Sequence, residues 1–221
     1  MAGVYQINPR KSFFGGISVT LTLVLLDVFL FIIFAIVLWQ MPGFIDYIAI
    51  KPSNILQGKF LWTILTSMFM HGGFFHIFAN MLSLFFVGSL VERILGRKRY
   101  LYFYLASGIF ASLLFVLLSL FFVGEYNAYA VGASGAIFGL IGLLMALTPN
   151  LPVFLMFIPI PIKMKYAAPG MLIVLWLISI AGNVSIGNTA HLGGFLVGIF
   201  YGAYLRSKYK RKTAYLSKFF S

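Results

Sequence analysis

The sequence predicts an all-α, polytopic membrane protein, with residues 1–221 forming one domain that folds as a bundle of six transmembrane helices. Three observations support this class. Of the 221 residues, 62% are hydrophobic and only 9% are charged. The mean hydropathy of +1.01 is too high for a soluble domain of that size. The apolar residues gather in six windows, and the basic residues gather in alternate connections between them.

The six windows have the lengths expected of helices that cross a bilayer. A spanning helix needs about 20 mainly apolar residues, within a range of roughly 17 to 25. The windows are residues 16–40, 74–94, 100–123, 133–149, 168–183 and 189–206. Residues 151–162 are also apolar, but they contain Pro152, Pro159 and Pro161, which argue against a straight helix. We expect a connector near the membrane interface there.

The lysine and arginine residues orient the bundle. With the N-terminus in the cytoplasm, fourteen of the 16 Lys and Arg residues flank the cytoplasmic side, and only Lys51 and Lys59 lie outside. Cytoplasmic loops carry such an excess, so both termini are predicted to be cytoplasmic. The membrane topology then explains the net charge of +12, and no nucleic-acid partner is needed to explain it. The basic tail after residue 205 is expected to lie on anionic lipid headgroups.

Three further features narrow the class. The first apolar window is too long for the core of a signal peptide, so we expect it to be retained, and such a compact chain suits a prokaryotic cell membrane. There is no cysteine, which excludes disulfides and Cys-ligated metal. The connection at residues 41–73 carries too much apolar surface for a solvated loop. It is expected to lie partly in the interface or to fold back against the bundle.

In the predicted orientation, polar residues from three windows meet in the outer leaflet. Ser134 and His191 lie at the outer ends of the fourth and sixth windows. His76 and Asn80 lie at the outer end of the second window and share one helix face. Because a polar side chain in hydrocarbon is costly unless it is partnered or faces water, this layer is the candidate functional site.

Glycines predict close packing of the fourth and sixth windows. They recur at helical spacing as Gly135, Gly139 and Gly142 in the fourth window and as Gly194, Gly198 and Gly202 in the sixth. Small residues at such spacing let two helix backbones approach closely. Since Gly194 follows His191 by three residues, the histidine lies on the packing face, and a hydrogen bond to Ser134 is geometrically plausible.

These residue types suit nucleophilic attack on a carbonyl group. The Ser134 hydroxyl must lose its proton to a nearby base, and a neutral His191 imidazole is suited to accept it. The backbone N–H of Ser134, His76 and the Asn80 amide are candidate donors to the oxyanion. The nearest acid in sequence, Glu125, lies in the preceding loop, so the pattern predicts a Ser–His dyad instead of a triad.

The set of motifs resembles the rhomboid family of intramembrane serine proteases. The matching segments are WTILTSMFMHGGFFHIFAN at 62–80, Glu92-Arg93 followed by Gly96, GASG at 132–135, and AHLGG at 190–194. The resemblance covers nearly the whole chain and implies a six-helix rhomboid-like bundle. It implies Ser134 as nucleophile and His191 as general base. His76 and Asn80, with the backbone of Ser134, would form the oxyanion hole.

The supporting positions of the predicted site are His71, Phe138, Gly132, Gly135 and Gly194. His71 matches a family histidine that is structural or water-retaining. Phe138 stands where the family often has an aromatic hydroxyl that stacks on the histidine, so the stacking is expected to survive without the hydroxyl. Trp62-Thr63 stands where rhomboids often carry Trp-Arg.

The resemblance implies cleavage of the transmembrane segments of other membrane proteins near their outer ends. The site would open to the extracytoplasmic side, the substrate would enter laterally with the fifth window as a candidate gate, and no metal or organic cofactor would be needed. Two other classes stay open. A non-catalytic rhomboid-like factor would bind transmembrane clients, although such relatives typically lack the serine or the histidine. A proton-coupled transporter would use Asp27 and the histidines.

Simpler interpretations of single residues also stay open. Ser134 could bond to its own helix, and His76 with Asn80 could form an interhelical clamp. His71 and His76 resemble a metal pair only weakly, because they are five residues apart and no acid or cysteine completes a ligand set.

Overall fold

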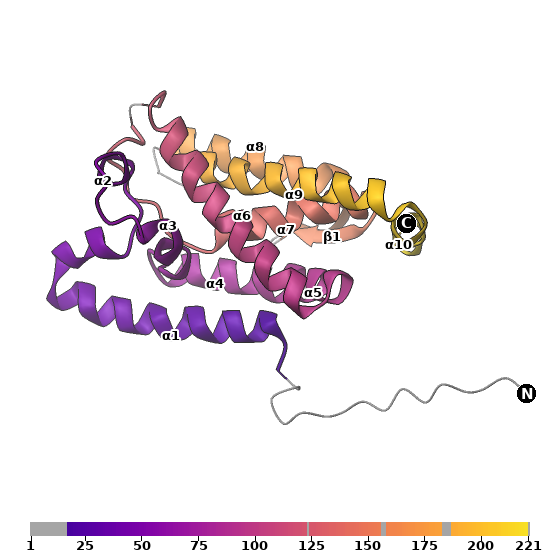
Figure 1. Ribbon diagram of the computed structural model, residues 1–221, viewed down its shortest axis with the longest axis horizontal. Coiled ribbons are helices and arrows are strands. Elements are labelled where there is room, and N and C mark those ends of the chain that lie inside the picture. Colours follow the sequence, from indigo (N-terminus) through magenta and orange to yellow (C-terminus); the bar gives the residue numbers. More distant parts are fainter. Residues whose placement is uncertain (1–16, 123, 156–157, 183–186, 221) are drawn as a thin grey trace, which may run out of the picture.

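The computed structural model describes residues 17–122, 124–155, 158–182 and 187–220, so residues 16, 123 and 183 of the predicted windows lie outside the described residues. Most of the long helices run roughly along the longest axis, whereas the helix at residues 97–118 crosses them obliquely (Figure 1). In chain order the elements are α1 (Val19–Gln40), a 3-10 segment (Pro42–Tyr47), α2 (Pro52–Leu56), α3 (Thr63–Thr66), a 3-10 turn (Ser67–Phe69), α4 (Phe74–Ser83), a π turn (Leu84–Gly88), α5 (Ser89–Leu95), α6 (Arg97–Leu118), α7 (Ser134–Leu147), β1 (Pro152–Leu155), β2 (Ile158–Lys163), α8 (Met164–Gly182), α9 (Asn188–Lys208) and α10 (Lys210–Phe219).

The core of the bundle lies around α7. This helix packs most extensively against α9 and also against α6, and eleven of its 14 residues are buried. In α1, by contrast, only Thr20, Leu23 and Asp27 are buried among 22 residues. The outward-facing apolar side chains of α1, such as Phe29 with 61% exposure, suit contact with lipid. The chain is therefore an all-α membrane protein with one central helix shielded by the others.

Four helices of the described residues are long and apolar enough to cross a membrane. They are α1, the continuous helix Phe74–Leu95, α6 and α8. The remaining two predicted spans correspond to α7, which has 14 residues, and α9, which has 21. Because α7 is covered by its neighbours, its length is not set by the thickness of the bilayer. The count of six spans stays a prediction.

The boundaries of α6 differ from the predicted window of 100–123. The helix begins at Arg97, directly after Gly96 at φ +78°, because charged residues that a hydropathy criterion rejects still form its first turn. It ends at Leu118, and the Ser119 hydroxyl donates to the Val116 carbonyl at 2.7 Å. Leu120 and Phe121, which follow Ser119, lie in a turn, and their hydropathy misled the prediction.

The fifth predicted window, 168–183, also begins too late, since α8 starts at Met164. The preceding connection supplies the reason. The backbone N–H of Met164 donates to the Leu151 carbonyl at 2.8 Å, and that of Lys165 donates to the Pro149 carbonyl at 3.0 Å. The first N–H groups of a helix need partners from outside it, and these bonds anchor the start of α8.

Residues 151–155 and 158–162 are not helical, as the prolines predict, but they are more regular than a simple connector. β1 and β2 pair antiparallel, with Pro152 opposite Lys163 and Leu155 opposite Ile158. A two-stranded sheet consists of edge strands only, and edge strands tolerate prolines such as Pro159 and Pro161.

The connection at residues 41–73 folds back against the bundle, which was one of its two predicted arrangements. Ile50 and Ala130 exchange two backbone hydrogen bonds of 3.1 and 2.9 Å. The Trp62 indole N–H donates to the Tyr47 carbonyl at 2.9 Å and braces the connection internally. The connection thus contacts the segment that leads into α7.

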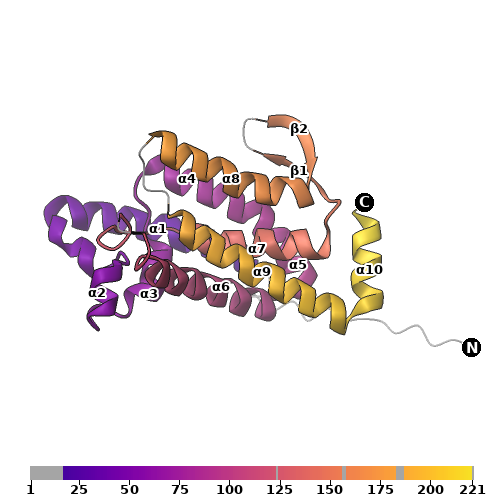
Figure 2. The same ribbon diagram turned by 90° about the horizontal axis from the view of Figure 1, so that it is seen from above.

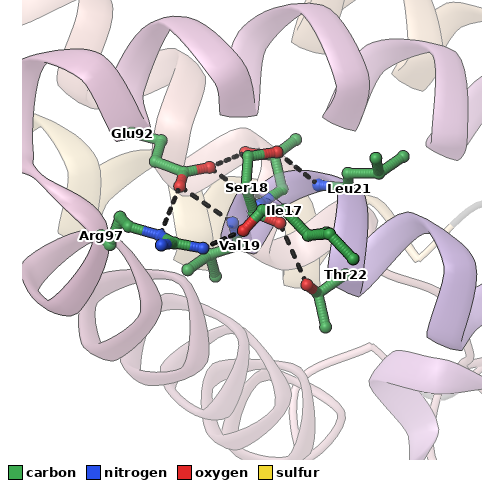
Figure 3. Close-up of polar contacts among 8 residues, drawn as sticks. Ile17, Ser18, Val19, Leu21, Thr22, Glu92 and Arg97 are labelled. Carbon is green, nitrogen blue, oxygen red and sulfur yellow. Dashed lines mark hydrogen bonds and ion pairs between the residues drawn. The ribbon is translucent and has the colours of Figure 1, made fainter. Parts of the chain in front are cut away.

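Glu92 joins the end of α5 to the start of α1. Its carboxylate accepts hydrogen bonds of 2.9 Å from the backbone N–H groups of Val19 and Thr20, and one of 2.7 Å from the Thr20 hydroxyl. Arg97 lies 3.7 Å from the carboxylate and donates to the Ile17 carbonyl (Figure 3). A carboxylate at a helix N-terminus satisfies unpaired N–H groups and complements the helix dipole. The Glu92-Arg93 motif therefore includes a tertiary cap of α1.

Glu92→Ala is expected to destabilise the protein by about 1–3 kcal/mol, because it leaves buried N–H groups without an acceptor. Glu92→Gln keeps one acceptor oxygen and should recover part of the loss. Thermal unfolding in a nonionic detergent measures both variants. An unchanged Tm for Glu92→Ala would contradict this role.

Candidate active site

Ser134 and His191 lie in the first turns of the two most closely packed helices. Ser134 is the first residue of α7, and His191 is the fourth residue of α9. Their side chains meet, with His191 Nε2 at 2.7 Å from Ser134 Oγ. His191 is 5% exposed. The structure therefore brings together the serine and the histidine that the sequence singled out, 57 residues apart in the chain.

Close approach of α7 and α9 makes this contact possible. A Cβ atom on Gly194 would collide with the Gly135 carbonyl oxygen, and one on Gly198 would collide with the Gly139 carbonyl oxygen. The predicted packing of the two glycine series is confirmed, since no larger residue fits at these crossings. Gly135 also faces α6, where an added Cβ would lie 2.7 Å from the Ala111 Cβ.

The His191 ring is held by packing and not by an acid. Phe138 stacks on it with ring centroids 4.6 Å apart and an interplanar angle of 26°, as the Phe138 position predicts. The buried Nδ1 atom has no hydrogen-bond partner among the described residues. Among the described residues, the Phe138 ring therefore orients the imidazole, and no carboxylate does.

His76 and Asn80 face the turn that precedes Ser134. Gly132 has φ +112°, and a Cβ there would lie 2.8 Å from His76 Nε2 and 3.9 Å from Asn80 Nδ2. The Gly132 N–H donates to the Ser67 carbonyl at 2.8 Å, which fixes the turn. Only glycine combines this backbone conformation with such close neighbours.

The polar atoms of His76 and Asn80 also have partners of their own. Asn80 Nδ2 donates to the His76 carbonyl at 2.9 Å, and the Gly72 N–H donates to His76 Nδ1 at 3.3 Å. His76 Nδ1 is thus an acceptor, which leaves Nε2 as the protonated nitrogen of a neutral ring. This tautomer directs an N–H donor toward Gly132, whereas Asn80 must share its amide with its own helix.

His71 lies behind His76 and reaches the buried acid of α1. The rings of His71 and His76 meet edge to face, with centroids 5.3 Å apart, and His71 Nδ1 lies 4.0 Å from Asp27 Oδ1. Both side chains have 0% exposure. Burial, and secondarily the neighbouring His76, lower the pKa of His71 to about 3, so its ring is neutral and the contact with Asp27 is not an ion pair.

Sequence reasoning named no partner residue for Asp27, although one signal was available. Thr20, Leu23 and Asp27 are spaced by three and four residues, so they share one helix face, and they are the buried residues of α1. An acid on the buried stripe of a membrane helix calls for a polar neighbour. The structure supplies His71 from the connection that precedes α4.

Glu125 is a second residue whose place the sequence did not reveal. Its carboxylate accepts a hydrogen bond of 2.8 Å from the Thr189 hydroxyl, two residues before His191. It does not orient the imidazole but ties the loop before α7 to the start of α9. Burial raises the pKa of Glu125, and the bond from Thr189 opposes this rise.

Glu125→Gln is expected to flatten the pH dependence of stability above the ordinary glutamate pKa of 4.5. A raised pKa in the folded state means that folding favours the protonated acid, so its contribution to stability is full below 4.5 and is lost as pH rises through the folded pKa. Thermal unfolding of both proteins from pH 4 upward measures the difference. A wild type that gains stability over the variant as pH rises would contradict this sign.

A small cavity adjoins the Ser134–His191 pair. It measures about 40 Å³ and is lined by residues that include Ser67, Gly108, Ala111, Gly132, Ser134 and His191. Since roughly 10–15 Å³ by this measure holds one water molecule, the cavity can hold water beside the serine hydroxyl. Within the described part of the chain, no group of three or more His, Asp or Glu side chains could hold a metal ion.

The fold and the site define a class: an all-α, multi-pass membrane protein with a hydrogen-bonded serine and histidine at the crossing of two glycine-rich helices. The family model for the rhomboid domain matches residues 59–208. The chain belongs to the rhomboid family.

Curated relatives agree with this assignment. "RHOMBOID-like protein 1" of Arabidopsis thaliana is 36% identical over 157 residues, which cover 70% of this chain and 37% of the relative. "Rhomboid protease GluP" of Bacillus subtilis is 35% identical over 159 residues, which cover 70% of this chain and 28% of the relative. "Rhomboid protein 1, mitochondrial" of Saccharomyces cerevisiae is 31% identical over 183 residues, which cover 76% and 49%. The chain thus spans less than half the length of each of these relatives.

Proposed function

We propose that this chain is an intramembrane serine endopeptidase that hydrolyses peptide bonds in or near the transmembrane segments of other membrane proteins. The observation that carries the proposal is the 2.7 Å contact between Ser134 Oγ and His191 Nε2. A serine hydroxyl is a weak nucleophile until an adjacent base accepts its proton, and this contact supplies the base.

In the proposed reaction, the Ser134 oxygen attacks the substrate carbonyl carbon while its proton passes to His191 Nε2. The carbonyl π electrons move to the oxygen and form a tetrahedral oxyanion. His191 then returns the proton to the amide nitrogen as the C–N bond breaks, which releases the amine and leaves an acyl-enzyme. A water molecule hydrolyses the acyl-enzyme by the same two proton transfers, and the cavity beside Ser134 is a place for it.

The oxyanion requires donors that converge on one point. The backbone N–H of Ser134 is the first of α7, where the helix provides no carbonyl partner and the helix dipole is positive. His76 Nε2 faces the same turn at Gly132. The Asn80 amide has two N–H groups, and one of them binds the His76 carbonyl. The other is a third candidate donor to the oxyanion.

We further propose that the site opens to the extracytoplasmic face of a cell membrane, with both termini in the cytoplasm. The distribution of Lys and Arg supports this orientation. A helical substrate must unwind before its carbonyl groups can be attacked, so small or helix-breaking residues are expected at the cleaved bond. The lateral entry route along α8 is part of the same proposal.

The test is cleavage of a single-span substrate in liposomes by the wild type and by Ser134→Ala. The proposal expects two fragments with the wild type and none with the variant, together with labelling of Ser134 by a fluorophosphonate probe. Binding of the substrate by both proteins without cleavage or labelling would instead favour the non-catalytic client-binding class. Cleavage that survives Ser134→Ala would overturn the mechanism.

A further inference from the structure

A large groove lies at the far ends of α7 and α9, away from Ser134 and His191. It measures about 670 Å³, within the range of roughly 300–1,000 Å³ that is usual for small-ligand sites. Its lining includes Leu147 at the end of α7 and Leu205 near the end of α9. Figure 2 shows α10 lying across this end of the bundle.

The lining of this distal groove combines apolar walls with positive charge. The apolar and aromatic side chains come from α5, from α10 and from the residues that flank α10: Leu90, Ile94, Leu95, Tyr209, Tyr215, Leu216, Phe219 and Phe220. Three exposed basic residues join them, namely Arg93 from α5, Arg99 from α6 and Lys212 from α10. Among the described residues, none that lines the groove is acidic. Its chemistry therefore fits a ligand with apolar chains and an anionic head.

The four acids of this chain lie elsewhere, and three of them accept hydrogen bonds there. Glu92 binds the start of α1, and Asp46 accepts hydrogen bonds from Asn54 and Tyr129. Asp27 faces His71, and Glu125 accepts from Thr189. The three basic side chains of the distal groove thus have no acidic partner among the described residues, and an anion from outside the chain can neutralise them.

We propose that the distal groove binds one anionic phospholipid. The acyl chains would lie along the leucine and phenylalanine side chains, and the phosphate would bind Arg93, Arg99 and Lys212. Guanidinium groups bind phosphate in a bidentate manner, and basic pockets at the membrane surface bind anionic headgroups. The sequence preceding α1 is a poor alternative occupant, because residues 1–16 contain Arg10 and Lys11 but no acid.

The membrane itself is the source of this ligand. The groove lies at the end of the bundle where Arg97, Lys98 and Arg99 begin α6 and where α9 ends in Arg206 and Lys208. Lys and Arg concentrate beside the membrane on the cytoplasmic side, where anionic lipids provide the opposite charge. The proposal does not depend on protease activity, since no described residue lines both the groove and the cavity beside Ser134.

The experiment measures lipid retention by the full chain in a neutral detergent, by native mass spectrometry. The probes are dioleoyl phosphatidylglycerol, dioleoyl phosphatidylcholine and soluble glycerol phosphate. The test variant is Arg93→Gln/Arg99→Gln/Lys212→Gln. The charge-matched control is Lys98→Gln/Lys163→Gln/Arg211→Gln, which removes three exposed basic residues that do not line the groove, two of them adjacent in sequence to residues that do.

The proposal expects the wild type to retain one phosphatidylglycerol molecule in preference to phosphatidylcholine. Loss of the three groove charges should weaken binding at least about tenfold, while the control should change it by less than about threefold. Lys212→Gln alone, at an exposed position of the last helix, should weaken binding about fivefold and serves if the triple variant does not fold.

Three results would each overturn the proposal. Equal losses of lipid binding in the triple variant and its control would show that the lipid is attracted by the positive surface charge in general and not by the groove. Equal retention of phosphatidylcholine would show that charge is not recognised. Displacement of the lipid by glycerol phosphate at equal concentration would show a site for a free phosphate.

Discussion

Replacing His191 by Ala is expected to lower kcat/KM for cleavage of a single-span substrate by at least about 10³-fold. The reason is the 2.7 Å contact between His191 Nε2 and Ser134 Oγ, which is the path by which the nucleophile loses its proton. A factor of 10³ corresponds to about 4 kcal/mol of transition-state stabilisation. The rate of fragment formation in liposomes measures it.

The double variant Ser134→Ala/His191→Ala sharpens this prediction. When two groups act in the same step, removing either one already abolishes their joint contribution to the rate. The double variant should therefore be no slower than the slower single variant. Additive losses would show that the two residues act separately and would contradict the dyad.

A matched serine provides the control. Ser107→Ala removes a buried hydroxyl of α6 that does not line the cavity beside Ser134. It makes the same chemical change as Ser134→Ala, and it should leave kcat/KM within about threefold. The Tm of each variant shows whether a loss of activity comes from the missing catalytic group or from unfolding of the protein.

Gly194→Ala is expected to give the largest loss of stability among single methyl additions at the helix crossings. The new Cβ would collide with the Gly135 carbonyl oxygen and would crowd the Gly139 backbone nitrogen at 3.2 Å. Backbone atoms of a neighbouring helix cannot rotate away, so α7 and α9 must separate. Overpacking of this kind typically costs about 1–3 kcal/mol and occasionally more. Thermal unfolding in detergent measures the change.

Gly170→Ala in α8 is the matched control, because a Cβ there meets nothing within 4 Å. It should be neutral or slightly stabilising, since alanine has the higher helix propensity. Separation of α7 and α9 should also lengthen the Ser134–His191 contact, so Gly194→Ala should lose cleavage even below its Tm. Equal Tm values for the two glycine variants would contradict the packing argument.

Much of the fold could be predicted because a membrane helix is recognisable from the hydropathy of its own segment. Long apolar runs predict α1 and the helix Phe74–Leu95, since every backbone group in lipid must be satisfied within its own helix. The same criterion misplaced the end of α6, because a turn rich in Leu and Phe has the hydropathy of a helix. It also gave no sign of the β1–β2 hairpin, whose pairing is a contact between strands.

The Ser134–His191 pair was predictable for a related reason. Glycine spacing identifies the faces on which two helices meet, and the positions of Ser134 and His191 along their windows place them at one depth. Two patterns that are each local to one helix therefore indicated that a contact across 57 residues is geometrically possible.

The sequence by itself determined the apolar helices, the glycine faces and the residue types of the candidate site, since each depends on spacing within one segment. Only the tertiary structure decided that Asp27 faces His71, that Glu125 binds Thr189 and that Glu92 caps α1. These contacts join residues 44 to 73 positions apart. The positions of such residues in space follow from the packing of all the helices together, and no periodicity within one helix encodes them.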